Sequence, residues 1–255
     1  MKTQLFLALL ACNVSLFADT WLYNSQKSKT DAHNYLFAES TSLTKREKLL
    51  VDHVKNAVKL SQNHSSGLTQ DILNLEGMSS TKNRCLLNNL LKLPKANYLE
   101  IGCWKGSTFI SALYGNQNTI ANATAIDNWS EFDGPYMEFA ANCSHYLQDG
   151  YKVYSHDCFA VDPKTVIKSP VHIYFYDGAH SAEAQSKAFT YYNSVLDNTF
   201  IAIVDDWNHG HAREGTLSAF KQLKYKVVYE IYLPARYNGD REQWWHGLYV
   251  AVVSK

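Results

Sequence analysis

The chain has 255 residues, which is long enough for one large α/β domain with a buried core and an extra segment at one end, but short for two full domains. Hydrophobic residues make up 46% and charged residues 19%, a composition that excludes a disordered chain. Lys plus Arg and Asp plus Glu both total 24, so no net positive charge is available to bind a polyanion. Nucleic acid is therefore not expected as a partner.

Residues 1–18 follow the order of a secretory signal, with Lys2, an apolar run over residues 5–11, and Ala18 at the end. The alternative is an apolar N-terminal segment that packs on the domain as a helix. The run is too short and too interrupted for a membrane span, so no transmembrane helix is expected.

Residues 19–78 are predicted to form a polar arm followed by an amphipathic helix. Until about residue 40 the sequence is polar without periodicity, which indicates a linker or an irregular segment. Between Leu43 and Leu60, apolar residues recur at helical spacing among charged ones, and NHSSGLTQ then ends the helix. Another helix is expected from Ser79 or Ser80 until Pro94.

From residue 98 onward, short apolar runs alternate with helical stretches. The expected strands are NYLEIG, ATAID, KVYSHD, VHIYFYD, FIAIVDD, KVVYEIYL and GLYVAVV. Helices are expected from Ser107 and over residues 136–147, 181–196 and 213–223. Alternation predicts an α/β fold with a doubly wound sheet of five parallel strands. The last two strands have no helix between them, so they should pair as an antiparallel hairpin at one edge, giving seven strands.

Gly102 and Gly106 lie in the turn after the first of these strands, where a doubly wound sheet usually binds its ligand. Without a Cβ, they allow the backbone to approach a ligand closely. A dinucleotide site would need G-x-G-x-x-G, but the third glycine is missing here and Glu100 precedes the turn. An acid suits a cationic ligand better than a pyrophosphate, so a dinucleotide oxidoreductase is disfavoured. The alternative is a tight turn that binds nothing.

The stretch LEIGCWKGS resembles motif I of the class I S-adenosylmethionine-dependent methyltransferases, and the expected strand order is similar to their Rossmann-like sheet. The resemblance implies S-adenosylmethionine as cofactor, with Glu100, Gly102 and Gly106 around its methionine part. It also implies that Asp127 accepts hydrogen bonds from the ribose hydroxyls and that Asp157 binds the adenine amino group. The alternative for Asp127 is a helix N-cap.

The stretch IYFYDGAH, with EGMSS ahead of motif I, resembles a branch of small-molecule and sugar O-methyltransferases, and residues 79–255 form the methyltransferase-like domain. In related catechol-type enzymes, acids at the corresponding strand ends hold a divalent cation such as Mg²⁺, which here implies Asp177, Asp205 and Asp206. Three converging carboxylates repel one another unless a cation or protons lie between them. A bound Mg²⁺ would lower the pKa of an acceptor hydroxyl.

The other candidate for catalysis is His180, which without a metal would be the general base, with Asp177 beside it. The alternatives are that His180 only bonds the turn and that the acids cap helices or face water. The tryptophans, Trp207 included, are expected to be packing residues; the alternative for Trp207 is a place over the acceptor, because it follows Asp206. The histidines of WNHGH, His209 and His211, are expected to be solvated rather than to bind a metal.

Two functions of different classes follow. The first is an S-adenosylmethionine-dependent methyltransferase acting on an oxygen of a small molecule or sugar. The second is an exported, non-catalytic domain of the same fold that binds a ligand or partner, because a signal-like N-terminus conflicts with a cofactor made in the cytosol. The same conflict leaves the location open between export and the cytoplasm. The cysteines after residue 18 fit disulfides or buried thiols equally.

Overall fold

The computed structural model describes residues 37–39 and 42–255. The signal-like segment of residues 1–18 and most of the polar arm lie outside the described residues.

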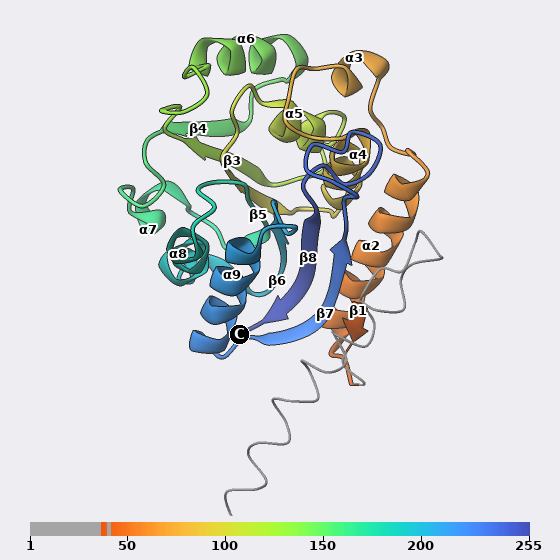
Figure 1. Ribbon diagram of the computed structural model, residues 1–255, viewed down its shortest axis with the longest axis vertical. Helices are drawn as coiled ribbons and strands as arrows, with labels where there is room; N and C mark the ends of the chain where they lie inside the picture. The colour runs from red at the N-terminus through yellow and green to blue at the C-terminus, as the bar shows by residue number, and fades with distance from the viewer. Residues whose placement is uncertain (1–36, 40–41) are drawn as a thin grey trace, which may run out of the picture. The chain divides into compact units, whose positions relative to one another are not determined.

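The described residues form one eight-stranded sheet of order β1-β7-β8-β6-β5-β2-β3-β4 (Figure 1). The strands are β1 (Phe37–Glu39), β2 (Asn97–Ile101), β3 (Asn122–Asp127), β4 (Tyr151–Ser155), β5 (Val171–Tyr176), β6 (Leu196–Val204), β7 (Lys226–Leu233) and β8 (Leu248–Ser254). The five strands β2 to β6 pair parallel with one another, whereas β8 runs antiparallel to both β6 and β7. The predicted Rossmann-like sheet with a C-terminal antiparallel pair is confirmed.

One strand was not predicted. Residues 19–40 were interpreted as irregular, but β1 pairs antiparallel with β7, with Phe37 opposite Ile231. Strand β1 is therefore the edge strand on this side, and the hairpin strand β7 is not. A three-residue strand shows too little alternation of polar and apolar residues to be recognised from sequence.

Helices cover both faces of the sheet. They are α2 (Lys45–Gln62), α3 (Gln70–Leu73), α4 (Thr81–Leu90), α5 (Ser107–Leu113), α6 (Tyr136–Tyr146), α7 (Pro163–Val166), α8 (Ala182–Tyr192) and α9 (Gly210–Gln222). Helices α8 and α9 pack together on one face, while α2, α4 and α5 pack on the other (Figure 1). The four-residue helices α3 and α7 were missed because one turn carries no periodicity. Within the described part, no helix combines the length and apolar character that crossing a membrane requires.

Helix α2 begins with a capping box that also reaches the sheet. The Thr44 hydroxyl accepts from the Glu47 backbone N–H at 3.2 Å, and the Glu47 carboxylate accepts from the Thr44 backbone N–H at 2.7 Å. The same carboxylate accepts from Lys226 and Ser254, each at 3.0 Å. Although burial opposes it, the bond from the Thr44 backbone, helped by these donors, lowers the pKa of Glu47 to about 2.

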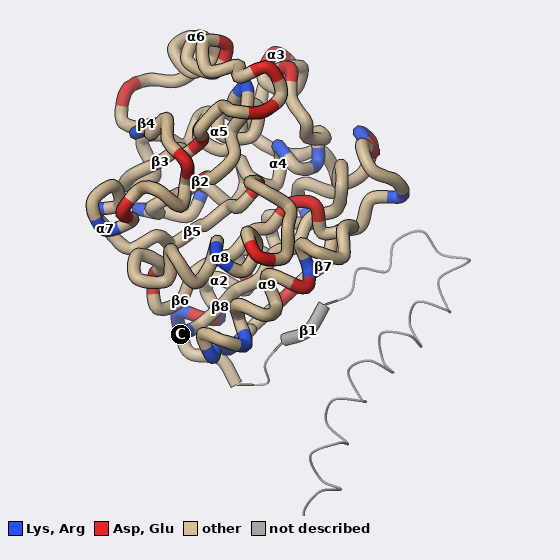
Figure 2. The backbone as a smooth tube through the Cα atoms, turned by 60° about the vertical axis from the view of Figure 1, so that its left-hand side comes forward, with Lys and Arg blue, Asp and Glu red and all other residues tan. Residues whose placement is uncertain are grey.

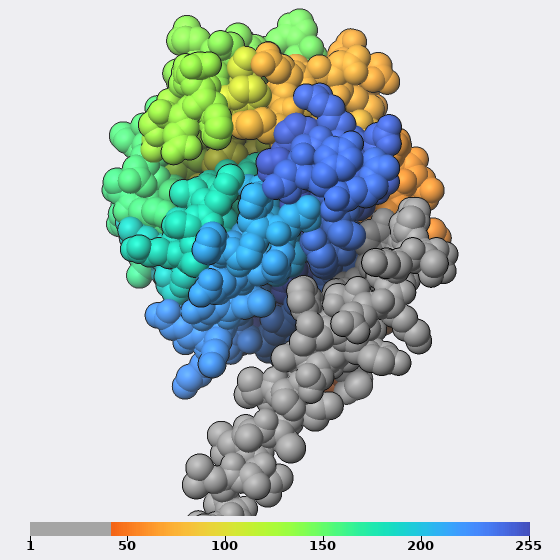
Figure 3. Space-filling model, in the orientation of Figure 1, coloured from red at the N-terminus to blue at the C-terminus, as the bar shows by residue number. Residues whose placement is uncertain are grey.

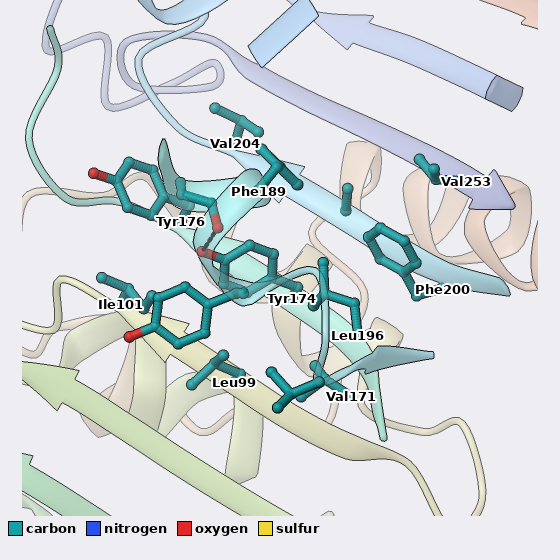
Figure 4. Close-up of a cluster of buried hydrophobic side chains, with 14 of the residues drawn as sticks. Leu99, Ile101, Val171, Tyr174, Tyr176, Phe189, Leu196, Phe200, Val204 and Val253 are labelled. Carbon is teal, nitrogen blue, oxygen red and sulfur yellow. Dashed lines mark hydrogen bonds between the residues drawn. The ribbon is translucent and has the colours of Figure 1, made fainter. Parts of the chain in front are cut away.

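Strands β2 and β5 are almost fully buried because helices cover both faces of a parallel sheet. Figure 4 shows Leu99 of β2, Tyr174 of β5 and Phe189 of α8 in one apolar cluster, with the Tyr174 hydroxyl donating to the Ala188 carbonyl at 3.0 Å. This packing fixes where the two strands end. Strands β3 and β4 follow β2 on one side, and the chain then returns to place β5 and β6 on the other side of β2. The topological switch point therefore lies between β2 and β5, which is where such sheets bind ligands.

The described part carries no large block of one charge, because acidic and basic residues are interspersed along it (Figure 2). Its cysteines are all free thiols, buried or half-buried: Cys85, Cys103, Cys143 and Cys158. Of the two possibilities that the sequence left open, buried thiols are therefore the one found.

Candidate functional site

A cavity of about 680 Å³ lies at the carboxyl ends of β2, β3, β5 and β6, within the range of about 300–1,000 Å³ typical of small-molecule sites. Figure 3 shows the segments around residues 130, 180 and 240, all of which contribute to its lining, coming together on the face in view. None of the described lining residues is Lys or Arg, whereas six are acids: Asp127, Glu131, Asp157, Asp177, Asp205 and Asp206. Such a lining favours a cationic ligand.

Gly102 lines this cavity, and packing within the sheet already requires it to be glycine. Its φ is +84°, and a Cβ at this position would lie 1.9 Å from the carbonyl oxygen of Asp177. Two hydrogen bonds fix this close approach, from the Gly102 N–H to the Ile126 carbonyl at 3.0 Å and from the Asp177 N–H to the Ile101 carbonyl at 2.8 Å. The ends of β2, β3 and β5 thus meet at one glycine.

Gly106 begins helix α5 in the left-handed region, with φ +87°. A Cβ there would lie 3.0 Å from the Phe139 ring, and Gly106 is not among the residues that line the cavity. Gly106 therefore turns the chain into α5 where the ring of Phe139 from α6 leaves no room for a Cβ.

Asp127 ends β3 and holds the turn between β2 and α5. One carboxylate oxygen accepts from the backbone N–H groups of Cys103 at 2.6 Å and Trp104 at 2.9 Å, and the other accepts from the Trp129 N–H at 2.8 Å. Trp104 has a positive φ of 44°, so the loop needs such support. The structure thus adds a loop-holding role that the sequence analysis did not consider. Because Asp127 also lines the cavity, a role toward a ligand remains available to it.

Glu100 is fully buried and does not line the cavity. Its carboxyl group accepts from the Tyr98 hydroxyl and, at 2.6 Å, from the Thr108 hydroxyl. Burial raises the pKa of Glu100 to about 8. Thr108 does line the cavity, so Glu100 acts on a ligand only through this hydroxyl, in contrast to the direct proximity that the resemblance implied.

Asp157 lies at the opposite end of the cavity, just after β4. It is exposed, and its carboxylate accepts from the Phe159 backbone N–H at 2.8 Å, which holds the turn that follows. Asp157 lines the cavity, as the implied contact with adenine requires.

Asp177 and Asp205 form a pair of facing carboxyl groups at the ends of β5 and β6. Burial, reinforced by the neighbouring Asp205 and Asp206, raises the pKa of Asp177 well above its usual range. Burial and the charge of Asp206 raise the pKa of Asp205 to about 7. The pair therefore retains a proton near neutral pH. One oxygen of Asp205, Oδ1, is buried and has no hydrogen-bond partner.

Asp206 is the centre of a histidine cluster. The side chain is 3% exposed, its Oδ2 lies 2.6 Å from Nε2 of His180, and its Oδ1 lies 2.6 Å from Nδ1 of His246. Although burial acts in the opposite direction, these two hydrogen bonds lower the pKa of Asp206 below its usual range. The bond to Asp206 raises the pKa of His180.

The three predicted acids lie near one another, with Asp205 facing Asp177 and Asp206 beside both, and histidines join them. One ligand atom each of Asp177, His180 and Asp206 lie within 4.8 Å of one another, and so do those of Asp206, His209 and His246. Asp205 takes part in neither group. The site of the described residues therefore mixes imidazole with carboxylate, where the sequence analysis expected three carboxylates.

The loop after β6 packs Trp207 into the core. Trp207 is 5% exposed, stacks on Tyr249 with ring centroids 4.0 Å apart, and does not line the cavity, where Trp245 does. His209 has a side chain that is 42% exposed, and its Nε2 lies 3.7 Å from Oδ1 of Asp206. His211, by contrast, has a side chain that is 77% exposed.

His246 was missed altogether. It lies 40 residues after Asp206, so no local motif joins them. The antiparallel pairing of the last strand was predicted, and the pairing of Val204 with Tyr249 places the residues just before β8 beside the end of β6. This register is the feature from which the position of His246 near Asp206 could have been predicted.

Comparison with known proteins gives the same fold. Residues 99–207 match the model of a methyltransferase domain. The structure is similar to an O-methyltransferase from Bacillus cereus, solved with S-adenosylhomocysteine, at 13% identity and TM-score 0.51, covering 83% of this chain and 98% of that one. It is also similar to a proposed caffeoyl-CoA O-methyltransferase from Staphylococcus aureus at 15% identity and TM-score 0.51, covering 82% and 99%. None of the curated proteins compared with the sequence matches it significantly. These solved structures share the fold of this chain, and the match over residues 99–207 is to a methyltransferase domain.

Proposed function

We propose that the protein is an S-adenosylmethionine-dependent methyltransferase that acts on an oxygen of a small molecule or sugar. The observation that carries the proposal is the acid-lined cavity, free of Lys and Arg among its described lining residues, at the turn of Gly102. The cofactor carries a sulfonium and an ammonium group, and an acidic cavity at the switch point of the sheet favours such cations. The methyltransferase-domain match over residues 99–207 supports the same assignment.

In this proposal the cofactor lies along the ends of β2, β3 and β4. The Gly102 turn allows close approach, Asp127 accepts from the ribose hydroxyls, and Asp157 accepts from the adenine amino group. When bound, S-adenosylmethionine supplies the methyl group, and its carbon–sulfur bond breaks as the acceptor oxygen attacks. Most of the rate acceleration then comes from orientation and exclusion of water.

His180 is the proposed general base. When its Nε2–H donates to Asp206, its Nδ1 is left unprotonated, and this nitrogen can take the proton of the acceptor hydroxyl. Asp206 orients the ring and stabilises the imidazolium that forms. Asp177, beside His180, is proposed to contact the same acceptor hydroxyl.

An Mg²⁺ ion held by three carboxylates does not fit these residues. Asp206 is hydrogen-bonded to the imidazole nitrogens of His180 and His246, and such a mixed set of nitrogen and oxygen donors suits transition ions rather than Mg²⁺, which prefers oxygen ligands alone. No step of the proposed reaction passes through Mg²⁺.

The first test is calorimetric titration of the full chain with S-adenosylmethionine and S-adenosylhomocysteine. We expect micromolar binding of both, weakened in Asp127→Ala. Absence of binding by the folded protein would refute the proposal and would favour the alternative of a non-catalytic domain that binds another ligand.

The base is tested separately once an acceptor has been found. We expect His180→Ala to lower kcat by about 10²–10⁴-fold while the affinity for S-adenosylhomocysteine stays unchanged. Because Asp206 raises the pKa of His180, kcat should fall as the pH drops through that raised value, where Nδ1 becomes protonated. His211→Ala is the control, since this exposed histidine lies outside the cavity. An unchanged kcat in His180→Ala would remove it as the base.

A further inference from the structure

We propose that His209, His246 and Asp206 bind one divalent first-row transition ion, with Zn²⁺ as the best match, at the end of the cavity next to His180. The site is distinct from a carboxylate site for Mg²⁺, and it does not depend on the proposed methyl transfer.

The ligand atoms already converge. One nitrogen from each histidine and one carboxylate oxygen of Asp206 lie within 4.8 Å of one another. Asp206 Oδ1 is 3.7 Å from Nε2 of His209 and 2.6 Å from Nδ1 of His246. Two ligands bound at 2.0–2.1 Å to a tetrahedral ion lie about 3.3 Å apart. The first distance is thus close to the required value, and the second must open by about 0.7 Å, which a small side-chain rotation provides.

The backbone holds the two histidine-bearing segments together. The Asn208 N–H donates to the His246 carbonyl at 2.9 Å, and the Trp207 N–H donates to the Gly247 carbonyl at 3.0 Å. The His209 N–H donates to the Asp206 carbonyl at 2.8 Å. The ligands therefore sit on a cross-linked pair of loops, and an ion would not have to order them.

The donor set selects the kind of ion. Two imidazoles and one carboxylate match Zn²⁺, Co²⁺ or Ni²⁺, whereas Mg²⁺ and Ca²⁺ take oxygen ligands. Three protein ligands leave a fourth tetrahedral position open, as in catalytic zinc sites. Asp206 and His246 line the cavity, which places the proposed ion at the cavity wall. The other oxygen of Asp206 remains on His180, which couples the ion to that ring.

The test is metal binding by the full chain after treatment with a chelator, with no cofactor present. Titration with Co²⁺ is followed by its visible absorption, titration with Zn²⁺ by calorimetry, and Mg²⁺ serves as the comparison ion. We expect one Co²⁺ per chain, displaced by Zn²⁺, and no comparable binding of Mg²⁺. His209→Ala and His246→Ala should each weaken binding by at least about tenfold.

The controls separate this site from its neighbours. His211→Ala should bind Co²⁺ like the unchanged protein, because that exposed histidine is two residues from His209 but outside the cluster. If His180→Ala loses Co²⁺ binding while His209→Ala binds Co²⁺ like the unchanged protein, the proposal is overturned. The ion would then belong to the group of Asp177, His180 and Asp206. Absence of Co²⁺ binding, or equal binding in all variants, would refute it. His209 has a side chain that is 42% exposed, so its variant should fold even if His246→Ala does not.

Discussion

Replacing Asp127 by alanine tests the role that only the structure revealed. The carboxylate accepts three backbone N–H bonds, from Cys103, Trp104 and Trp129. Alanine would leave these three donors without an acceptor in a loop whose Trp104 and Trp129 both have positive φ. The loop should therefore lose its support before any ligand is considered.

The magnitude follows from the three bonds. A hydrogen bond to a charged group contributes about 1.5–3 kcal/mol when buried, and Asp127 is half-buried, so we take about 1 kcal/mol for each bond. The free energy of unfolding should fall by about 3 kcal/mol. For a domain of this size, 1 kcal/mol shifts Tm by about 2–4 °C. Asp127→Ala should therefore lower Tm by about 6–12 °C in the absence of cofactor.

The assay is thermal unfolding followed by circular dichroism, without and with S-adenosylhomocysteine. The matched control is Asp157→Ala, which lines the same cavity but accepts one backbone N–H, from Phe159, at an exposed position. The control should lower Tm by no more than about 4 °C. If Asp127→Ala unfolds within 2 °C of the unchanged protein, the loop does not depend on this carboxylate and the reasoning fails.

Two further predictions concern stability. Gly102→Ala should lower the free energy of unfolding, measured in urea titrations, by about 3–5 kcal/mol, because the new Cβ would meet the Asp177 carbonyl. The control is Gly115→Ala, where φ is also positive but the space is open, and it should lower this free energy by only about 1–2 kcal/mol. Equal losses would contradict the steric argument. Glu47→Gln should cost about 1 kcal/mol at pH 7 through the lost pair with Lys226. Because folding lowers the pKa of Glu47 from 4.5 to about 2, this difference should shrink as the pH falls from 4.5 towards 2; a constant difference would refute it.

The sheet was predictable because its pattern repeats over a long stretch. Every strand from β2 to β8 was expected within a few residues of its bounds, since each is an apolar or alternating run set off by turns or helices, even β4, which has no fully buried residue. The elements that were missed, β1, α3 and α7, have three or four residues, which is below the length at which either periodicity can be seen.

The strand ends were predictable in the same way, but the directions of their side chains were not. Alternation along β2 puts Glu100 and Ile101 on opposite faces, yet only the packed structure shows that Glu100 lies beneath Thr108. Likewise, Asp205 and Asp206 are neighbours in sequence but point to different partners, one to Asp177 and the other to histidines. Site composition therefore depended on tertiary packing that no motif encodes.

Four of the six acids that line the cavity are compensated in different ways, and the other two, Glu131 and Asp157, are exposed to solvent. Backbone N–H groups compensate Asp127, histidines compensate Asp206, and the pair of Asp177 and Asp205 retains a proton. The groups that hydrogen-bond to these carboxylates belong to loops that the sheet holds in position, so the fold fixes where the carboxylates lie. In the proposed function the acidic lining favours a cationic cofactor, and the histidines around Asp206 are the proposed place for proton transfer and for a metal.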